Sequence, residues 1–232
     1  KILNKKAFKY GGSVVSILGN HELYSYYYYN DNMFNKEYVK QIDLDDYKNK
    51  FKMKRKDYYY PGKGDGAKNF GKTRPMIIQI GEVLFSHGTI SKNFVKLYTN
   101  NLTKKINIQQ INDEMSKWLM GKGIKPKFID MEEEFNPLFD RSLSDPINMS
   151  PMKCHEKFYS ILKFFYNAKY MIMGHSVHKK INSLCDNKVF RVDIAISRAF
   201  GGTLENNIKK MQVLEIIQEP NKKTIFNIIK KS

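Results

Sequence analysis

An α/β fold with an added antiparallel part is the class that this sequence predicts, and three patterns indicate it. Short apolar runs of strand length are bounded by glycines or other turn residues. Hydrophobic residues between these runs recur at helical spacing. In the last third of the chain the strand-like runs follow one another closely, which is typical of antiparallel strands joined to an α/β core.

The expected strands begin near the start of the chain. Ser13–Leu18 is a short apolar run that ends at Gly19, which favours a buried parallel strand. The runs 76–80 and 83–85 flank Gly81-Glu82 and predict a hairpin. The other runs of strand length are 170–173, 189–196, 211–217 and 224–229.

Two helices are expected between these strands. Hydrophobic residues at helical spacing predict an amphipathic helix over 106–120, and a second set predicts another helix that ends near Asn167. The first set is Ile108, Ile111, Met115 and Trp118, and the second is Phe158, Ile161, Leu162 and Phe165. The segment 58–72 contains Pro61 and four glycines and is expected to be a loop, and 122–151 is turn-rich.

The composition excludes several classes of protein. Over 232 residues, 41% hydrophobic, 13% aromatic and 27% charged residues are values typical of a globular chain with its own core. No apolar run approaches the length of about 20 residues that a membrane helix needs. The two cysteines, Cys154 and Cys185, are too few for a disulfide scaffold or a thiolate-rich zinc module. We expect both to be reduced thiols in an intracellular, cytoplasmic setting.

The net charge of +17 has two interpretations. It resembles the footprint of a nucleic-acid-binding protein, and the tyrosines at 26–29 and 58–60 could stack on bases. However, only five of the 40 basic residues are arginine, the side chain that reads phosphates and bases as a fork. We therefore expect no specific nucleic-acid partner and interpret the charge as attraction to anionic substrates. The tyrosines are expected to pack, or to shape a phosphotyrosine pocket.

Three short histidine segments each follow a predicted strand. They are Gly19-Asn20-His21-Glu22, Ser86-His87-Gly88 and Gly174-His175-Ser176. Ligands of open α/β sheets collect at the carboxyl ends of strands, and neighbouring glycines let the backbone approach a bound group closely. Imidazole nitrogens and amide oxygens suit borderline transition metals. The ordered set therefore predicts that these three segments converge on one metal-binding edge.

The same residues carry a family resemblance. The series GNHE, LFSHG and GHS resembles the calcineurin-like metallophosphoesterases, in particular their phosphoprotein phosphatase branch. The tail RVDIAISRAFGG, over 191–202, closely resembles the Shewanella-like protein phosphatases, and NPLFDR over 136–141 resembles their Pro-Leu-Trp-x-Arg segment with Phe139 in place of tryptophan. The likeness covers about Gly11 to Ile217.

This resemblance implies a two-sheet α/β sandwich flanked by helices (αββα) and a role for five residues. Asn20, His87 and His175 would ligate one of two divalent metal ions, for which manganese is favoured over iron or zinc. His21 would be the general acid, and Arg141 would hold the phosphate as a bidentate fork. The implied reaction is hydrolysis of phosphoserine, phosphothreonine or phosphotyrosine in phosphoprotein substrates by a metal-activated hydroxide.

The sequence also departs from the family pattern, and the departures bear on whether the active site is complete. The family opens with an Asp-x-His segment and a Gly-Asp-x-x-Asp-Arg-Gly segment, and neither is present here. We therefore expect residues 1–232 to form a catalytic domain that lacks its N-terminal strands and the ligands of the first metal, with 24–75 as a variable insertion. The alternative is an inactive pseudophosphatase or phosphate-binding module. Thr89 also stands where the family has a second glycine after His87-Gly88.

Four other features have more ordinary interpretations. His178 lies one residue too far along for the GHxH motif of the wider superfamily and is expected at the surface or in a hydrogen bond. His155 lies in a predicted helix and is expected to be structural. Glu132–Glu134 are expected to form a solvated acidic turn. Asp193 could orient a metal-ligand histidine or join a structural ion pair.

Overall fold

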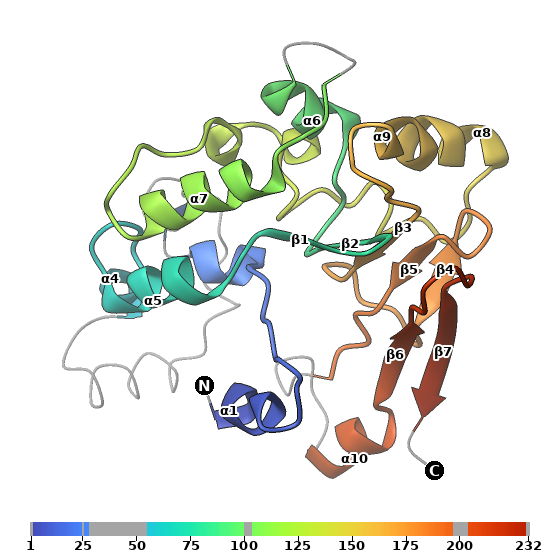
Figure 1. Cartoon of the computed structure of the whole chain (residues 1–232). Coiled ribbons are helices and arrows are strands. Elements are labelled where there is room, and N and C mark those ends of the chain that lie inside the picture. Colours follow the sequence, from blue (N-terminus) through green and yellow to red (C-terminus); the bar gives the residue numbers. More distant parts are fainter. Residues whose placement is uncertain (1, 25, 28–54, 100–103, 197–203, 231–232) are drawn as a thin grey trace. The chain divides into compact units, whose positions relative to one another are not determined.

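The computed structural model describes residues 2–24, 26–27, 55–99, 104–196 and 204–230 (Figure 1). The chain divides into two compact units, one made of 1–77 and 108–129 and the other of 78–107 and 130–232. No helix in the described ranges has the length and apolar character needed to pass through a lipid bilayer.

The first unit is helical. Its elements are α1 (Ile2–Phe8), the 3-10 turn η1 (Asn20–Leu23), α4 (Arg55–Tyr58), α5 (Asp65–Thr73), α7 (Ile108–Leu119) and the 3-10 turn η3 (Lys127–Asp130). The expected helix over 106–120 is confirmed as α7, and the side chains that predicted it are buried at Ile111, Met115 and Trp118. Helix α5 packs on α7, where the Ser116 hydroxyl donates to the Gly71 carbonyl at 2.6 Å.

The prediction of a loop over 58–72 is correct for 59–64, where the chain turns and Gly62 has a φ of 78°, but wrong for 65–72, which lies in α5 and whose glycines serve packing. A Cβ at Gly66 would lie 2.5 Å from the Tyr58 ring, and one at Gly71 would lie 2.8 Å from the Ser116 carbonyl oxygen. Helix α5 tolerates both glycines because the tertiary contacts outweigh their low helix propensity.

The predicted strand Ser13–Leu18 is also wrong. The segment has no strand structure, and Val14 and Val15 are exposed. Its backbone bonds run from the Val14 N–H to the Asn4 side chain and from the Leu18 N–H to the Pro75 carbonyl. A strand needs a partner strand for its N–H and C=O groups, and the described part of the chain supplies none here.

Of the tyrosines in the two predicted clusters, Tyr26 and Tyr27 are buried in this unit, and Tyr28 and Tyr29 lie outside the described residues. Tyr26 and Tyr27 are each 9% exposed, and the Tyr26 ring meets the Trp118 ring edge-on with centroids 5.2 Å apart. The Lys125 ammonium donates to the Tyr26 hydroxyl at 2.9 Å. These rings are core rather than a stacking platform for bases.

The second unit is built on a five-stranded sheet of order β1-β2-β3-β5-β4. The strands are β1 (Ile77–Ile80), β2 (Val83–Ser86), β3 (Tyr170–Met173), β4 (Asn182–Leu184) and β5 (Val189–Arg191). Strands β2, β3 and β5 are parallel, and β4 runs antiparallel to β5. The predicted hairpin over 76–85 and the strand 170–173 are confirmed.

A second sheet, the hairpin of β6 (Gln212–Ile217) and β7 (Ile225–Lys230), packs on the first. Phe226 of β7 lies with its ring 4.7 Å from Tyr170 and 4.4 Å from Phe190, centroid to centroid. Leu214 and Ile216 complete this apolar layer.

The helices of the unit are α6 (Lys92–Tyr98), α8 (Pro151–Cys154), the π-helical turn η5 (His155–Tyr159), α9 (Ser160–Leu162) and α10 (Leu204–Lys209), with a 3-10 turn η4 (Glu133–Phe135). The two-sheet α/β sandwich is therefore confirmed (Figure 1).

Two predicted boundaries in this unit need correction. The helix expected to end near Asn167 begins at Pro151, capped by the Ser150 hydroxyl, and ends at Leu162. The strand expected over 189–196 ends at Arg191, because the Asp193 carboxylate accepts a bond from the Ala195 N–H and the chain turns there. Ala195 has a φ of 55°, which no strand residue adopts.

The prediction of two reduced cysteines is wrong. Cys154, at the end of α8, and Cys185, in the turn after β4, form a disulfide with their Cα atoms 5.5 Å apart. They are 31 residues apart in the chain, so only the packing of α8 beside this turn brings the two thiols together. The bond closes the edge of the sheet where β5 begins.

Candidate functional site

Two predicted metal ligands meet at the carboxyl edge of the sheet. His87 directly follows β2 and His175 follows β3 after Gly174. Because β2 and β3 are parallel neighbours, both histidines emerge at the same edge, as expected. Nε2 of His87 lies 3.0 Å from Nδ1 of His175, and the Gly174 N–H donates to the His87 carbonyl at 2.9 Å.

The backbone at His175 is in an unusual conformation. Its φ is 67°, in the left-handed region that residues other than glycine seldom adopt, although asparagine, aspartate and histidine do so more often than the rest, and the residue is 9% exposed. Such a conformation costs about 1–3 kcal/mol and concentrates at functional sites. This conformation turns the chain directly after β3 and places the His175 ring beside that of His87.

The turn after β2 is fastened to the segment 136–143. The Gly88 N–H donates to the Pro137 carbonyl at 2.8 Å and the Thr89 N–H donates to the Asp140 carbonyl at 2.9 Å. A Cβ at Gly88 would lie 2.7 Å from the Asp140 carbonyl oxygen, so the close approach requires glycine. The Thr89 hydroxyl accepts a bond from the Leu143 N–H at 3.0 Å. A glycine at this position, as in the family pattern, has no hydroxyl and could not accept this bond.

Arg141 is positioned by the turn that carries His175. Its Nη1 donates to the His175 carbonyl at 3.2 Å and to the Ser176 hydroxyl at 3.1 Å. The Ser176 hydroxyl also bonds to the Ser144 hydroxyl at 2.8 Å. Both contacts use Nη1 of an exposed side chain, so, within the described residues, the other guanidinium N–H groups are available to an anion.

Asp140 is a buried carboxyl beside Arg141. The residue is 2% exposed, and its Oδ1 accepts a bond from the Ser142 N–H at 2.7 Å. Desolvation by burial raises the pKa of Asp140, and hydrogen bonds from Ser142 and Thr89 and the charge of Lys157 offset part of that rise. Its Oδ2 is buried without a hydrogen-bond partner in the described part of the chain.

Asn20 and His21 belong to the first unit. Both lie in η1, where the Asn20 amide donates to the Tyr24 hydroxyl at 3.4 Å and Nε2 of His21 lies 3.0 Å from the same hydroxyl. Asn20 is buried and His21 is exposed. The Glu22 side chain accepts from the Gly19 N–H and pairs with Arg74 at 2.6 Å, which fixes the turn. The convergence of this turn with His87 and His175 stays a prediction.

The donor atoms present fit part of one metal site. Two imidazole nitrogens 3.0 Å apart can both reach one ion, because metal–imidazole bonds are about 2.0–2.1 Å long. Within the described ranges, however, no three histidine, cysteine or acidic side chains gather closely enough to hold a metal. His87 and His175 thus fit two ligands of one ion.

The other predicted residues have structural contacts. Nε2 of His178 lies 2.7 Å from the Ser144 carbonyl, so its predicted hydrogen-bonding role is confirmed. The Asp193 carboxylate bonds to the Ala195 N–H. His155 is exposed on η5, and Glu132–Glu134 are exposed as expected. Arg198 of the family tail lies outside the described residues.

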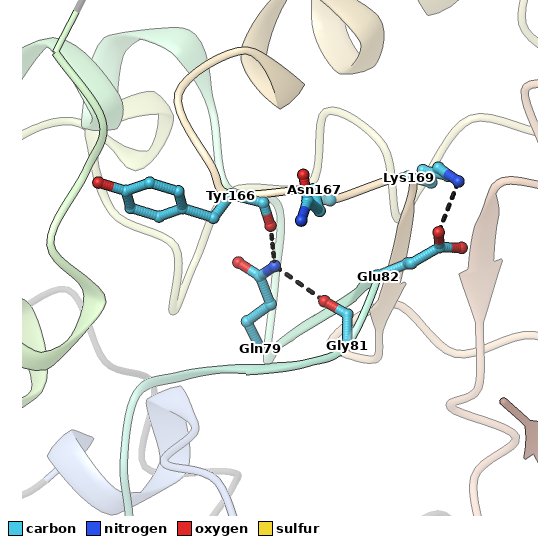
Figure 2. A pocket seen from close by; sticks show the side chains of 7 residues that line it. Gln79, Gly81, Glu82, Tyr166, Asn167 and Lys169 are labelled. Atoms are coloured by element: carbon cyan, nitrogen blue, oxygen red, sulfur yellow. Dashed lines mark hydrogen bonds and ion pairs between the residues drawn. The ribbon is translucent and has the colours of Figure 1, made fainter. Parts of the chain in front are cut away.

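Two cavities flank the ends of these strands. One of about 430 Å³ lies beside Arg141 and is lined by Glu133, Glu134, Asp140, Arg141, Ser142, Asp145 and Pro146. The other, of about 540 Å³, lies at the opposite, amino edge of β2 and β3 (Figure 2). There Glu82 pairs with Lys169 at 2.5 Å and raises its pKa through that hydrogen bond, and the Gln79 amide donates to the Gly81 and Tyr166 carbonyls.

Comparison with known proteins finds two relatives that match almost the whole chain. The chain is 26% identical over 236 residues to Shewanella-like protein phosphatase 1 of Plasmodium berghei, covering 95% of this chain and 59% of that protein. It is 26% identical over 245 residues to an uncharacterised protein of Acanthamoeba polyphaga mimivirus, covering 94% of each. No protein-family model matches.

The predicted resemblance to the Shewanella-like protein phosphatases is confirmed. Crystal structures of a cold-active protein tyrosine phosphatase, one from a psychrophilic Shewanella species, have the same fold, with 20% identity and a TM-score of 0.60 in two comparisons. These cover 87% and 91% of this chain and 54% and 58% of the phosphatases. The chain therefore has the calcineurin-like fold and spans less than two thirds of the Shewanella-like phosphatases that it matches.

Sequence reasoning missed the residues that hold this edge together. Thr89, Asp140 and Ser176 join the turn after β2, the segment with Arg141 and the turn after β3. Thr89 was noted only as a departure from the family glycine. A hydroxyl beside His87-Gly88 is a signal that could have predicted a bond to a neighbouring loop.

Proposed function

We propose that this chain is part of a metal-dependent protein phosphatase that hydrolyses phosphate monoesters of phosphoproteins. The observation that carries the proposal is the placement of His87, His175 and Arg141 at one sheet edge, with Arg141 bonded to the carbonyl of His175. A divalent ion held there would supply charge neutralisation and an activated water molecule. The relative's name says only protein phosphatase and the matched crystal structures are named protein tyrosine phosphatase, so the proposal includes phosphotyrosine beside phosphoserine and phosphothreonine.

The side chains of this chain have separate tasks in that reaction. His87 and His175 would hold a metal ion through ring nitrogens. Arg141 binds two oxygens of the phosphoryl group through a planar guanidinium, which also orients the phosphorus for attack. His21 gives a proton to the oxygen of the departing serine, threonine or tyrosine, a step worth about 10²–10⁴-fold in rate.

The test is hydrolysis of p-nitrophenyl phosphate by the full chain with and without Mn²⁺. His21→Asn should lower turnover by about 10²–10⁴-fold while the bound metal, measured by elemental analysis, is unchanged. His155→Asn is the matched control, because this histidine is exposed on η5, outside the site. Normal turnover in His21→Asn would contradict the acid role.

A phosphate-binding module without turnover is the second candidate. It is favoured by the described histidine, cysteine and acidic side chains, which form no complete metal site although Arg141 is in place. A chain that binds phosphopeptide in an Arg141-dependent manner, but hydrolyses nothing with Mn²⁺ present, would support this candidate. The Arg141→Lys variant should weaken phosphate binding about tenfold or more, since an ammonium cannot form the bidentate fork.

A further inference from the structure

The cavity beside Arg141 has a charge opposite to that of the chain as a whole. Its described lining residues include four carboxyls, those of Glu133, Glu134, Asp140 and Asp145, and one basic side chain, Arg141. The chain as a whole carries +17. A local excess of carboxyls in such a basic chain produces a field that attracts cations to this one place.

The two glutamates are free to act on a ligand. Glu133 and Glu134 are exposed, and within the described residues their carboxylates take part in no ion pair or hydrogen bond. Their backbone is fixed, because the Asn136 N–H donates to the Glu133 carbonyl at 2.9 Å and the Ser91 hydroxyl donates to the Glu134 carbonyl. The charges are therefore held in place by η4 while their carboxylates remain available.

Asp140 supplies a second, independent sign of a ligand. It lines the cavity, is 2% exposed, and has an Oδ2 atom that lacks a hydrogen-bond partner among the described residues. A buried carboxylate oxygen without a partner is costly, so a cation held in the cavity would stabilise this carboxylate through its charge. Outside the lining, Arg191 interacts electrostatically with Asp145 and Lys157 with Asp140, whereas the Glu133 and Glu134 carboxylates take part in no ion pair within the described residues.

A metal ion does not fit this cavity. Within the described part of the chain its carboxyls do not gather in a group that could coordinate one. A long cationic side chain needs no such convergence, because its ammonium or guanidinium head can pair with one or two carboxylates while its aliphatic stem lies along the cavity wall.

The geometry points to this cavity as a subsite for a lysine or arginine of the substrate, next to the phosphorylated residue that Arg141 binds. This inference rests on the proposed function, since the neighbouring phosphate gives the subsite its place in recognition. It narrows the substrate class to phosphoproteins with a basic side chain close to the phosphate. A chain of net charge +17 would otherwise repel such sequences.

The test is binding of fluorescent peptides to the full chain, followed by anisotropy in moderate salt. A single lysine is moved from three positions before to three positions after a phosphotyrosine or phosphoserine in a glutamine-rich peptide, and each peptide is also made without phosphate. The best lysine position should bind about threefold to tenfold more tightly than the peptide without lysine. Glu133→Gln with Glu134→Gln should abolish that preference.

Glu132→Gln is the matched control, because Glu132 is exposed in the same acidic run but does not line the cavity, and it should keep the preference. Equal or weaker binding of every lysine peptide would overturn the inference, as would a preference that survives the double variant. Phosphate and lysine are varied separately, so the two proposals can fail separately. Lysine preference without any phosphate dependence would count against the phosphatase proposal while supporting a cationic subsite.

Discussion

The two ends of strands β2 and β3 differ in chemistry rather than in size. At the amino ends a cavity of about 540 Å³ is lined by Glu82 and Lys169, which neutralise each other, and by Gln79, whose amide bonds to two carbonyls (Figure 2). At the carboxyl ends His87, His175 and Arg141 meet, and the backbone of His175 is in a costly conformation. The larger cavity is the one whose polar groups already satisfy one another, so volume alone is a poor guide to the site.

The largest expected difference between the ends is in activity. His175→Asn should lower turnover with Mn²⁺ by more than about 100-fold, because even residues that only support metal ligands are worth about 10- to 100-fold. Asparagine tolerates a positive φ, so the midpoint of thermal unfolding should change little. Turnover and unfolding measured on the same preparation decide this, and full turnover would remove His175 from the site.

At the amino edge the effect should fall on stability instead. Replacing both Cys154 and Cys185 by serine should lower the free energy of unfolding by about 2–4 kcal/mol, since the disulfide restrains the unfolded chain. Turnover per folded molecule should stay the same. Urea unfolding of the variant, compared with the native chain under oxidising conditions, measures the loss. A large fall in turnover at full folding would show that the two edges are coupled.

A smaller effect is expected at Gly88, whose backbone lies against the backbone of Asp140. Gly88→Ala would place a Cβ 2.7 Å from the Asp140 carbonyl oxygen, and such overpacking costs about 1–3 kcal/mol. Because this contact fixes the segment with Arg141, phosphate affinity should fall as well. Gly12→Ala is the control, since its nearest neighbour would be an ordinary 3.6 Å away. Thermal unfolding with and without inorganic phosphate separates the two effects.

The smallest effect is expected at the Glu82–Lys169 pair. Glu82→Gln should change neither turnover nor the midpoint of thermal unfolding measurably, because the lysine is exposed and surface ion pairs contribute little. A loss of turnover in this variant, checked on p-nitrophenyl phosphate, would show that the cavity of Figure 2 has a role in the reaction.

The sequence predicted the parts of this molecule that depend on local pattern. Strand β3, helix α7 and the hairpin of β1 and β2 follow from apolar periodicity, and the convergence of His87 and His175 follows from parallel strands. Helix α5 lies where the glycines predict a loop. Those glycines allow close contacts with Tyr58 and Ser116, and such tertiary contacts are not visible in a local sequence pattern.

The disulfide and the supports of the site were beyond local pattern for the same reason. Cys154 and Cys185 meet only after α8 packs beside the turn that follows β4. Asp140 and Ser176 have functional neighbours only because two loops distant in the chain lie together. The roles of Asn20 and His21 depend on the family resemblance and stay predictions.

The bonds from Gly88 and Thr89 to the segment around Asp140 have one more consequence. His87, a predicted metal ligand, and Arg141, the predicted phosphate-binding residue, are thus connected through two backbone hydrogen bonds between the segments that carry them. Glu133 and Glu134 line the cavity beside Arg141 but are exposed, so under our proposal substitutions there would change which peptides bind while leaving these backbone bonds in place.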